Sequence, residues 1–425
     1  MSQAVRYGRI MRERGLTASD ILEQLEKRQS AEPDVHAGRL FGLVYPSGRA
    51  DLEELIAEVN SRYLFGNALN PFRFPELAAL EAQVIESVAD MLHRPESPQR
   101  AGAMTSGGTE SILLSMLVHR QRARARGIEH PQILAPESAH PAYAKAAHFF
   151  DLELVQIPLD GKWRADVEAA RSLVTERTAV IVASAFSYPY GIMDPVEELA
   201  GLAAEAGAGC HVDACIGAFI LPFLERLGHD VPPFDFRVPG VTTMSADIHK
   251  YGFVPKGAST VLHRQDDWFE HQGFLYDKWG AGLYGSAAMA GARPASPVAC
   301  SWAVINYLGV EGYSEIMGGL VELTSRFTSA VESFDGVELV GEPIGPVVAF
   351  RPTPDGPDLH AVADAMAERG WYVNRNVHPR GIQLMLSPGH APVMDDLLAD
   401  LTAAVAAVSG RPRGDSAGED PPRYS

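Results

Sequence analysis

The chain has 425 residues, of which 46% are hydrophobic and 21% are charged, as in an ordinary water-soluble protein with one large and one smaller domain. Its formal net charge of -18 argues against a nucleic-acid-binding protein, because such a protein needs a basic surface. A small anionic ligand is still compatible, since a local cationic pocket can lie within an acidic shell.

Cysteine usage and hydropathy indicate the compartment. Cys210, Cys215 and Cys300 are too few and too scattered for a disulfide framework or a zinc site, so we expect buried reduced thiols and no metal. MSQAVRYGRIMRERG lacks the apolar core of a signal peptide, and the longest apolar run, 214–224, is too short to cross a bilayer. We therefore expect a soluble cytoplasmic protein without an integral membrane segment.

Residues 1–60 predict an N-terminal helical segment. Apolar residues recur at helical spacing in ASDILEQLEKRQSAEP, for which Ser19 is the candidate N-cap, and again in DLEELIAEVNSRYLF. A third helix, PELAALEAQVIESVADMLH, begins at Pro75. It opens the next part of the chain.

From residue 61 to 300 the pattern alternates between strands and helices. A strand end, a glycine turn and a helix are indicated by AGAMTSGGTESILLSMLVHRQRARARG, and AVIVASAF is typical of a buried parallel strand. Further strands are predicted at QILAPES, LELVQIP, VTTMSADIHKYG and ASTVLHR, and a helix at PVEELAGLAAEAG. The alternation predicts a large α/β domain with a mostly parallel sheet.

The pattern changes over residues 301–410. A long helical stretch is followed by strands near VELVGEP and PVVAFRP, a helix at LHAVADAMAERG, strands at WYVNRN and IQLMLSP, and a final helix. This predicts a small C-terminal α+β domain. The tail, 411–425, has little apolar content to bury, so we expect it to be disordered.

The segment TSGGTES lies where a strand leads into a helix. Backbone N–H groups and the helix dipole bind anions at such a place, and Gly107 and Gly108 let a phosphate approach the backbone closely. The alternative is an ordinary helix start, with Ser106 or Thr109 as N-cap and Glu110 in the first turn.

Two further segments place charged residues at strand ends. HVDAC puts Asp213 after a predicted buried strand, where a carboxylate needs a partner: a protonated heterocyclic nitrogen, a metal or an arginine. SADIHK puts Lys250 after His249 at the end of another strand. A phosphate cradle, an aspartate and a lysine in this order suit a pyridoxal phosphate enzyme, in which the lysine forms a Schiff base and the aspartate keeps the pyridine nitrogen protonated.

These segments resemble the group II, decarboxylase-like branch of the fold-type-I pyridoxal phosphate enzymes and, within it, the sphingosine-1-phosphate lyases. The resemblance extends in register from Gly38 to Ala303. It is carried by TSGGTESIL, PESAH, HVDACIGAF, PFDFRVPGVTTMSADIHKYGFVPKGAS and GLYGSAAMAGARP. It implies a large domain with a seven-stranded, mainly parallel sheet and a small C-terminal α+β domain.

The resemblance also implies roles for single residues. Lys250 matches the Schiff-base lysine, Asp213 the partner of the pyridine nitrogen, and His140 the histidine that stacks on the cofactor ring. The positions that match the phosphate site of pyridoxal 5'-phosphate are Gly108, Thr109, His249 and, from a second subunit, Ser286. The last match implies an obligate homodimer with active sites at its interface.

A second set of matches concerns a small amino phosphate substrate. Lys256 matches a lysine near the substrate phosphate, and Tyr45 lines the same site and is a further catalytic candidate. Where the lyases have N-P-L-H, this chain has N-A-L-N, so Asn70 replaces a histidine that helps to bind the substrate phosphate or assists the proton transfers. An asparagine donates a hydrogen bond but cannot be a cation or a general base.

Three other residues have two interpretations each, and two more have one. Tyr188 and Tyr190 line the pocket or pack a turn, and Arg293 binds a carboxylate or forms a salt bridge at a dimer interface. We interpret His211 as a core histidine with satisfied hydrogen bonds. His378 lies where the small domain of such folds reaches the mouth of the active site.

Three functions are compatible with these residues. The first is a carbon–carbon lyase that cleaves a sphingoid base 1-phosphate by a retro-aldol reaction to a long-chain aldehyde and phosphoethanolamine. The alternative is an amino-acid decarboxylase on the same scaffold. A non-catalytic binding relative is the third, which the retention of Lys250, Asp213 and the phosphate cradle opposes.

Overall fold

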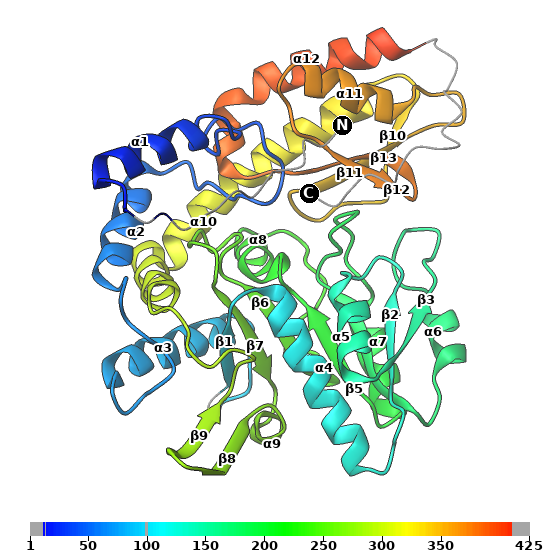
Figure 1. The fold of residues 1–425 in the computed structure, drawn as a ribbon. Coiled ribbons are helices and arrows are strands. Elements are labelled where there is room, and N and C mark those ends of the chain that lie inside the picture. Colours follow the sequence, from blue (N-terminus) through cyan, green and yellow to red (C-terminus); the bar gives the residue numbers. More distant parts are fainter. Residues whose placement is uncertain (1–11, 13, 98–100, 410–425) are drawn as a thin grey trace.

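A seven-stranded sheet forms the centre of the larger part of the computed structural model, which describes residues 12, 14–97 and 101–409 (Figure 1). The strand order is β1-β7-β6-β5-β4-β2-β3. The strands are β1 (Gly102–Thr105), β2 (Gln132–Pro136), β3 (Glu153–Ile157), β4 (Thr178–Ser184), β5 (Gly209–Asp213), β6 (Val241–Asp247) and β7 (Ser259–His263). Strand β7 runs antiparallel to its two neighbours, β1 and β6, and the other neighbouring strands of this sheet pair in parallel. This confirms the predicted mainly parallel arrangement.

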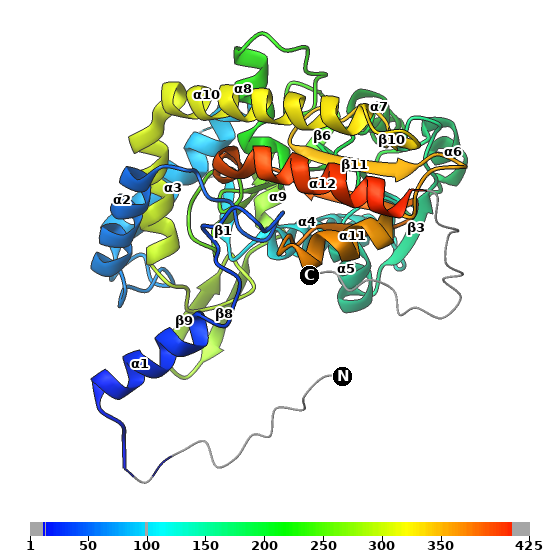
Figure 2. The ribbon, with the colours of Figure 1, turned by 90° about the horizontal axis from the view of Figure 1, so that it is seen from above.

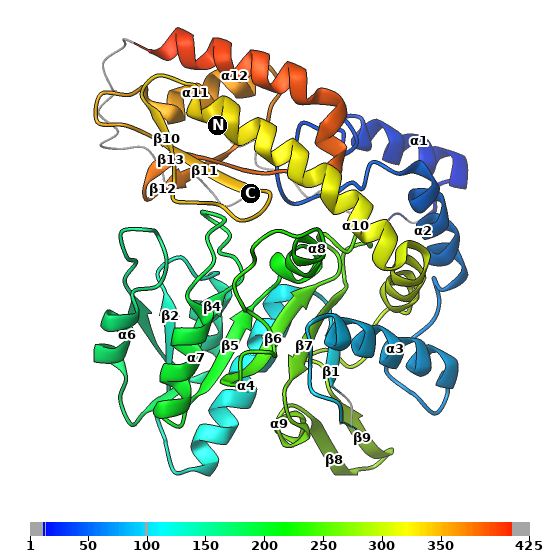
Figure 3. The same ribbon diagram turned by 180° about the vertical axis from the view of Figure 1, so that it is seen from behind.

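Helices cover both faces of this sheet. The helices are α3 (Pro75–Met91), α4 (Gly108–Ala125), α5 (Ala142–Phe150), α6 (Val167–Leu173), α7 (Val196–Glu205), α8 (Leu221–Arg226) and α9 (Asp266–Glu270), with a 3-10 turn η1 (Gly217–Phe219). Helix α4 packs across the central strands on one face, and α7 packs against β4 and β5 on the other (Figure 3). Strands β4 and β5 are therefore buried at every residue, as their apolar sequences predict.

A smaller antiparallel sheet lies in the C-terminal part, with the strand order β10-β11-β13-β12. Its elements are β10 (Val337–Leu339), β11 (Val347–Pro352), α11 (Leu359–Glu368), β12 (Asn374–Val377), β13 (Arg380–Met385), a 3-10 turn η2 (Pro388–Val393) and α12 (Met394–Val408). Helix α10 (Ser296–Glu332) packs against α2 and α3 and also against β10 and α12, so it belongs to both parts. Gly309, with φ 56°, bends it.

Two N-terminal helices precede the sheets, α1 (Ala18–Gln29) and α2 (Ala50–Arg62). Helix α1 has no buried residue and projects from the body of the molecule (Figure 2). The proposed N-cap Ser19 is wrong, because Thr17 accepts the backbone N–H of Asp20 at 3.1 Å and Asp20 completes a capping box. The tail predicted to be disordered lies outside the described residues.

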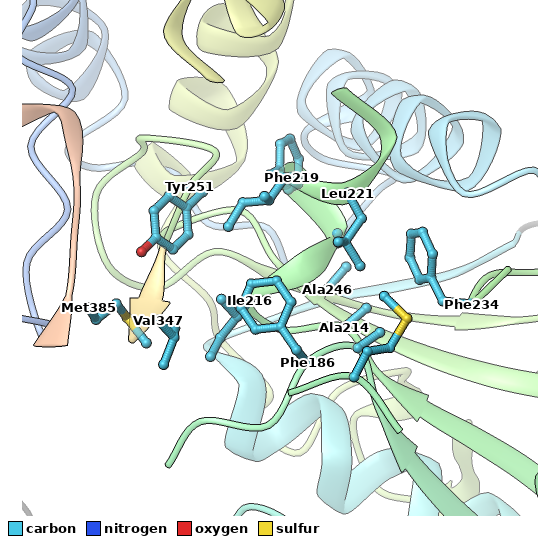
Figure 4. Packing of buried hydrophobic residues seen from close by; sticks show 14 of the residues in the cluster. Phe186, Ala214, Ile216, Phe219, Leu221, Phe234, Ala246, Tyr251, Val347 and Met385 are labelled. Carbon is cyan, nitrogen blue, oxygen red and sulfur yellow. The ribbon is translucent and has the colours of Figure 1, made fainter. Parts of the chain in front are cut away.

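The hydrophobic core continues from the large sheet to the small one. Phe186, Ile216 and Phe219, which follow β4 and β5, pack together with Val347 of β11 and Met385 of β13 (Figure 4). All five side chains are nearly inaccessible to solvent. Among the described helices, none is both long enough and apolar enough to span a bilayer.

A hairpin that the sequence analysis did not predict follows α9. It consists of β8 (Phe274–Trp279) and β9 (Gly282–Ser286), which pair only with each other among the described strands. Nearly all of its residues are exposed, although many are large and apolar. Leu275 is 74% exposed and Leu283 is 73% exposed.

Candidate active site

A cavity of about 340 Å³ opens at the carboxyl ends of β4, β5 and β6 and at the start of α4. Ligands of parallel α/β sheets bind at this edge, because the loops that follow the strands meet there. Six of the residues selected from the sequence line the cavity together: Gly108, Thr109, His140, Asp213, His249 and Lys250.

The start of α4 is open toward this cavity. Gly107 is the N-cap residue and makes no side-chain capping bond, so the backbone N–H groups of the first turn are available to an anion. A Cβ atom on Gly108 would lie 2.7 Å from the Cys215 sulfur and 2.8 and 2.9 Å from the Asp247 carboxylate oxygens. Only glycine fits at position 108 without displacing these groups.

The predicted alternative, a helix capped by Ser106 or Thr109, is not found. The backbone N–H of Ser106 instead donates to Glu110 Oε2 at 2.7 Å, and its hydroxyl lies 2.5 Å from the same oxygen. The other oxygen of Glu110 accepts the backbone N–H of Met289 at 2.8 Å. Glu110 therefore ties the glycine turn to the segment that follows the hairpin.

Asp213 ends β5 and is held by two neighbours. Its Oδ1 accepts the backbone N–H of Cys215 at 3.1 Å and the hydroxyl of Ser245 at 3.2 Å. Near it, His140 Nδ1 accepts the N–H of Ala142 at 3.1 Å, which puts the proton of the neutral ring on Nε2. Burial lowers the pKa of His140, so its ring is neutral at neutral pH.

Lys250 forms a buried ion pair that the sequence analysis missed. Its Nζ lies 3.0 Å from Asp247 Oδ2, and His249 Nε2 lies 3.7 Å from the same oxygen. Burial opposes the charge on Lys250, yet the Asp247 carboxylate raises the pKa of this lysine well above its ordinary value. Burial lowers the pKa of His249 to about 4. The available sequence signal was the acid three residues before the lysine in SADIHK.

Lys256 and Tyr45 lie together beside this pair. Lys256 Nζ is 4.3 Å from the centroid of the Tyr45 ring and donates a hydrogen bond to the carbonyl of His249 at 3.2 Å. Burial, and then the charge of Lys250, lowers the pKa of Lys256 to about 8. Lys256 is thus a cation at neutral pH that loses its charge easily.

Besides Tyr45 and Lys256, two other predicted residues, Asn70 and Ser286, do not line the cavity of their own chain. Asn70 is exposed, and its Oδ1 accepts the N–H groups of Phe72 and Arg73 at 3.0 and 3.1 Å. The Ser286 hydroxyl lies at the end of the hairpin, within hydrogen-bond distance of two nearby backbone carbonyls. A single chain therefore does not bring these two residues to Lys250.

The small domain reaches the cavity through one loop. Tyr188 lines the cavity, and its backbone carbonyl accepts a hydrogen bond from Gln383 of β13 at 3.0 Å. Asn376 of β12 donates to the carbonyl of the residue after Tyr188 at 2.8 Å, and the Tyr190 hydroxyl donates to the carbonyl of His378. Tyr188 thus lines the pocket, whereas Tyr190 fastens the loop.

The structure also bears on the interpretations of two other residues. His211 is fully buried and lies within hydrogen-bond distance of the Ser115 and Thr243 hydroxyls, which confirms a core histidine. Arg293 pairs with both oxygens of Glu81 in its own chain, at 2.8 and 3.1 Å. Its roles at a dimer interface or on a substrate carboxylate stay predictions.

Comparison with known proteins shows the family of this chain. A family model described as the pyridoxal-dependent decarboxylase conserved domain matches residues 28–353. A sphingosine-1-phosphate lyase of Arabidopsis thaliana is 39% identical over 400 residues, which are 92% of this chain and 73% of the relative. A probable sphingosine-1-phosphate lyase of Legionella pneumophila is 35% identical over 89% of this chain and 64% of the relative.

Solved structures agree as well. The sphingosine-1-phosphate lyase of Burkholderia pseudomallei superposes with a TM-score of 0.89 at 35% identity, over 95% of this chain and 94% of that one. A glutamate decarboxylase of Lactobacillus brevis, with a TM-score of 0.82 and 21% identity over 95% and 96% of the two chains, shares the fold. The chain therefore belongs to the sphingosine-1-phosphate lyase family of pyridoxal-dependent enzymes.

Proposed function

We propose that the protein is a pyridoxal phosphate-dependent aldehyde-lyase that cleaves a sphingoid base 1-phosphate into a long-chain aldehyde and phosphoethanolamine. One observation carries the proposal. Lys250, Asp213 and the open start of α4 share a single cavity, and the cation of Lys256 lies beside it. A substrate with an amine and a phosphate on adjacent carbons meets both groups.

The residues of the cavity fit the cofactor. Lys250 would supply the amine for the cofactor aldehyde, Asp213 a carboxylate for the pyridine nitrogen, and Gly108 and Thr109 the N–H groups for the phosphate. When bound, the cofactor withdraws electrons from the substrate carbon that carries the amine. The neutral ring of His140, in the same cavity, is available to pack on the cofactor ring.

The protein selects which substrate bond breaks. Lys256 and the neighbouring Tyr45 would hold the substrate phosphate, which would fix the rotation of the substrate about the bond to its amine. Cleavage then requires removal of the proton on the substrate's C3 hydroxyl, followed by a proton delivered to C2. Lys250 is the amine of the cavity that could exchange these protons.

We further propose that two chains form a homodimer with active sites at the interface. The hairpin exposes Leu275 and Leu283, and the loop that carries Asn70 exposes Phe65 at 96% and Phe72 at 93%. Such large apolar surfaces on one chain favour burial against another. A partner that covers both surfaces offers a place for Asn70 and Ser286, which do not reach the cavity of their own chain.

The decarboxylase alternative is less well supported. A decarboxylase needs a cation to align the substrate carboxylate, and Arg293, the candidate from the sequence, is neutralised by Glu81. We also place the protein in the cytoplasm, where its three free, buried cysteines stay reduced.

The proposed function is tested with purified, cofactor-loaded protein and sphinganine 1-phosphate. Long-chain aldehyde and phosphoethanolamine should both appear with the wild type, and neither should appear with Lys250→Ala as the blank. Binding of the substrate without aldehyde would refute the proposal. Release of carbon dioxide from amino acids under the same conditions would favour the decarboxylase.

A further inference from the structure

Asp247 stands out in the cavity because its carboxylate lies where the phosphate of the proposed cofactor would bind. It ends β6, is 3% exposed, and lies against the start of α4, where a Cβ atom on Gly108 would touch both of its oxygens. A buried carboxylate beneath a phosphate cradle repels a phosphate and is costly to ionise. Its presence therefore needs a specific counterion.

That counterion is Lys250. The two side chains lie three residues apart in a turn, with Nζ 3.0 Å from Oδ2. The other carboxylate oxygen, Oδ1, is buried and has no hydrogen-bond partner among the described residues. The main contact of this buried carboxylate is therefore the ion pair with Lys250.

The remaining charged and titratable groups near this pair come from several elements. His249 lies 3.7 Å from Asp247, the hydroxyl of Ser259 on β7 also stabilises its charge, and Asp213, Cys215 and Tyr45 contribute to the field at Lys250. Burial disfavours the ionised carboxylate, but Lys250 and then His249 lower the pKa of Asp247 below its ordinary value. The pair is thus ionised, as an ammonium and a carboxylate.

We propose that Asp247 is a positioning residue that holds Lys250 as an ammonium in the cofactor-free protein and fixes the place of its Nζ at the end of β6. The proposal rests on the role of Lys250 in the proposed function, but not on which substrate is cleaved.

The test uses cofactor-free protein and cyanate, which carbamylates only neutral amines, with the modified peptides quantified by mass spectrometry. The exposed Lys162 is the internal reference for reagent and pH. We expect Lys250 of the wild type to react with a pH midpoint above that of Lys162. In Asp247→Asn the buried lysine loses its counterion, so its labelling relative to Lys162 at pH 7.5 should rise at least tenfold, about the effect of one pKa unit.

The variant Asp247→Glu keeps the carboxylate and should restore slow labelling, which a merely structural role for Asp247 does not predict. Equal relative labelling of Lys250 in wild type and Asp247→Asn would overturn the proposal. If Asp247→Asn does not fold, a wild-type midpoint for Lys250 below that of Lys162 would overturn it as well. These results are independent of aldehyde formation, so the proposed substrate can fail while the role of Asp247 stands.

Discussion

The lowered pKa of Lys256 leads to a quantitative prediction about phosphate binding. Burial and the charge of Lys250 put this pKa at about 8, so the free side chain is charged below about pH 8 and neutral above it. A phosphate dianion gains its ion pair only with the charged form. The affinity of the site for a phosphate dianion should therefore fall about tenfold per pH unit above pH 8. Between pH 7 and pH 9.5 the fall is about 30-fold, which corresponds to about 2 kcal/mol of binding free energy.

A simple alkyl phosphate without an amine is the suitable probe, because it has no group that titrates in this range. Its inhibition constant against the loaded enzyme, measured from pH 7 to pH 9.5, should rise along this curve in the wild type. Lys256→Arg keeps its charge over the whole range and should give a flat profile. Lys256→Met should bind weakly at every pH. An inhibition constant of the wild type that does not change up to pH 9.5 would refute the reasoning.

Three further predictions concern the cofactor, the interface and acid stability. Gly108→Ala should weaken binding of pyridoxal phosphate at least tenfold in an absorbance titration, whereas Gly201→Ala, with open space around its Cα, should not. Leu283→Asp should convert a dimer to monomers in analytical ultracentrifugation and abolish activity with them; a dimeric variant would contradict the proposed interface. Burial lowers the pKa of His119 to about 3 and of His263 to about 4. Below pH 6.5 the unfolded chain binds protons at these histidines and the folded chain does not, so the free energy of unfolding is highest above pH 6.5 and falls as the pH approaches the two lowered values. Urea unfolding at about pH 4.5 should show a loss of about 2–3 kcal/mol for each histidine, and the His119→Gln variant should lose less; an equal loss in that variant would contradict this assignment.

The residues of the cavity were predictable because they follow buried parallel strands. Strands such as β4 and β5 are continuous apolar runs, and a polar residue just after such a run lies at one edge of the sheet. Asp213, Lys250 and the glycine turn were therefore found from local patterns combined with the family resemblance. The structure then brought them to one cavity.

What could not be predicted depends on contacts between distant segments or on exposure. The hairpin lacks the alternation of a half-buried strand, because nearly all of its side chains are exposed in one chain. Arg293 could not be assigned to Glu81, which lies more than two hundred positions away. Asp247 was overlooked since a turn, not a helix, brings it against Lys250.

The three hydrogen bonds between the small domain and the loop at Tyr188 affect how this enzyme can be redesigned. Gln383 and Asn376 contact only backbone carbonyls of that loop, so their bonds do not depend on the loop's side chains, whereas the loop's path depends on both amides. Exchanging Tyr188 alone would alter the wall of the pocket and leave its placement intact. A chimera that replaces the C-terminal domain with that of a relative would move this wall unless the loop and strands β12 and β13 are transplanted together.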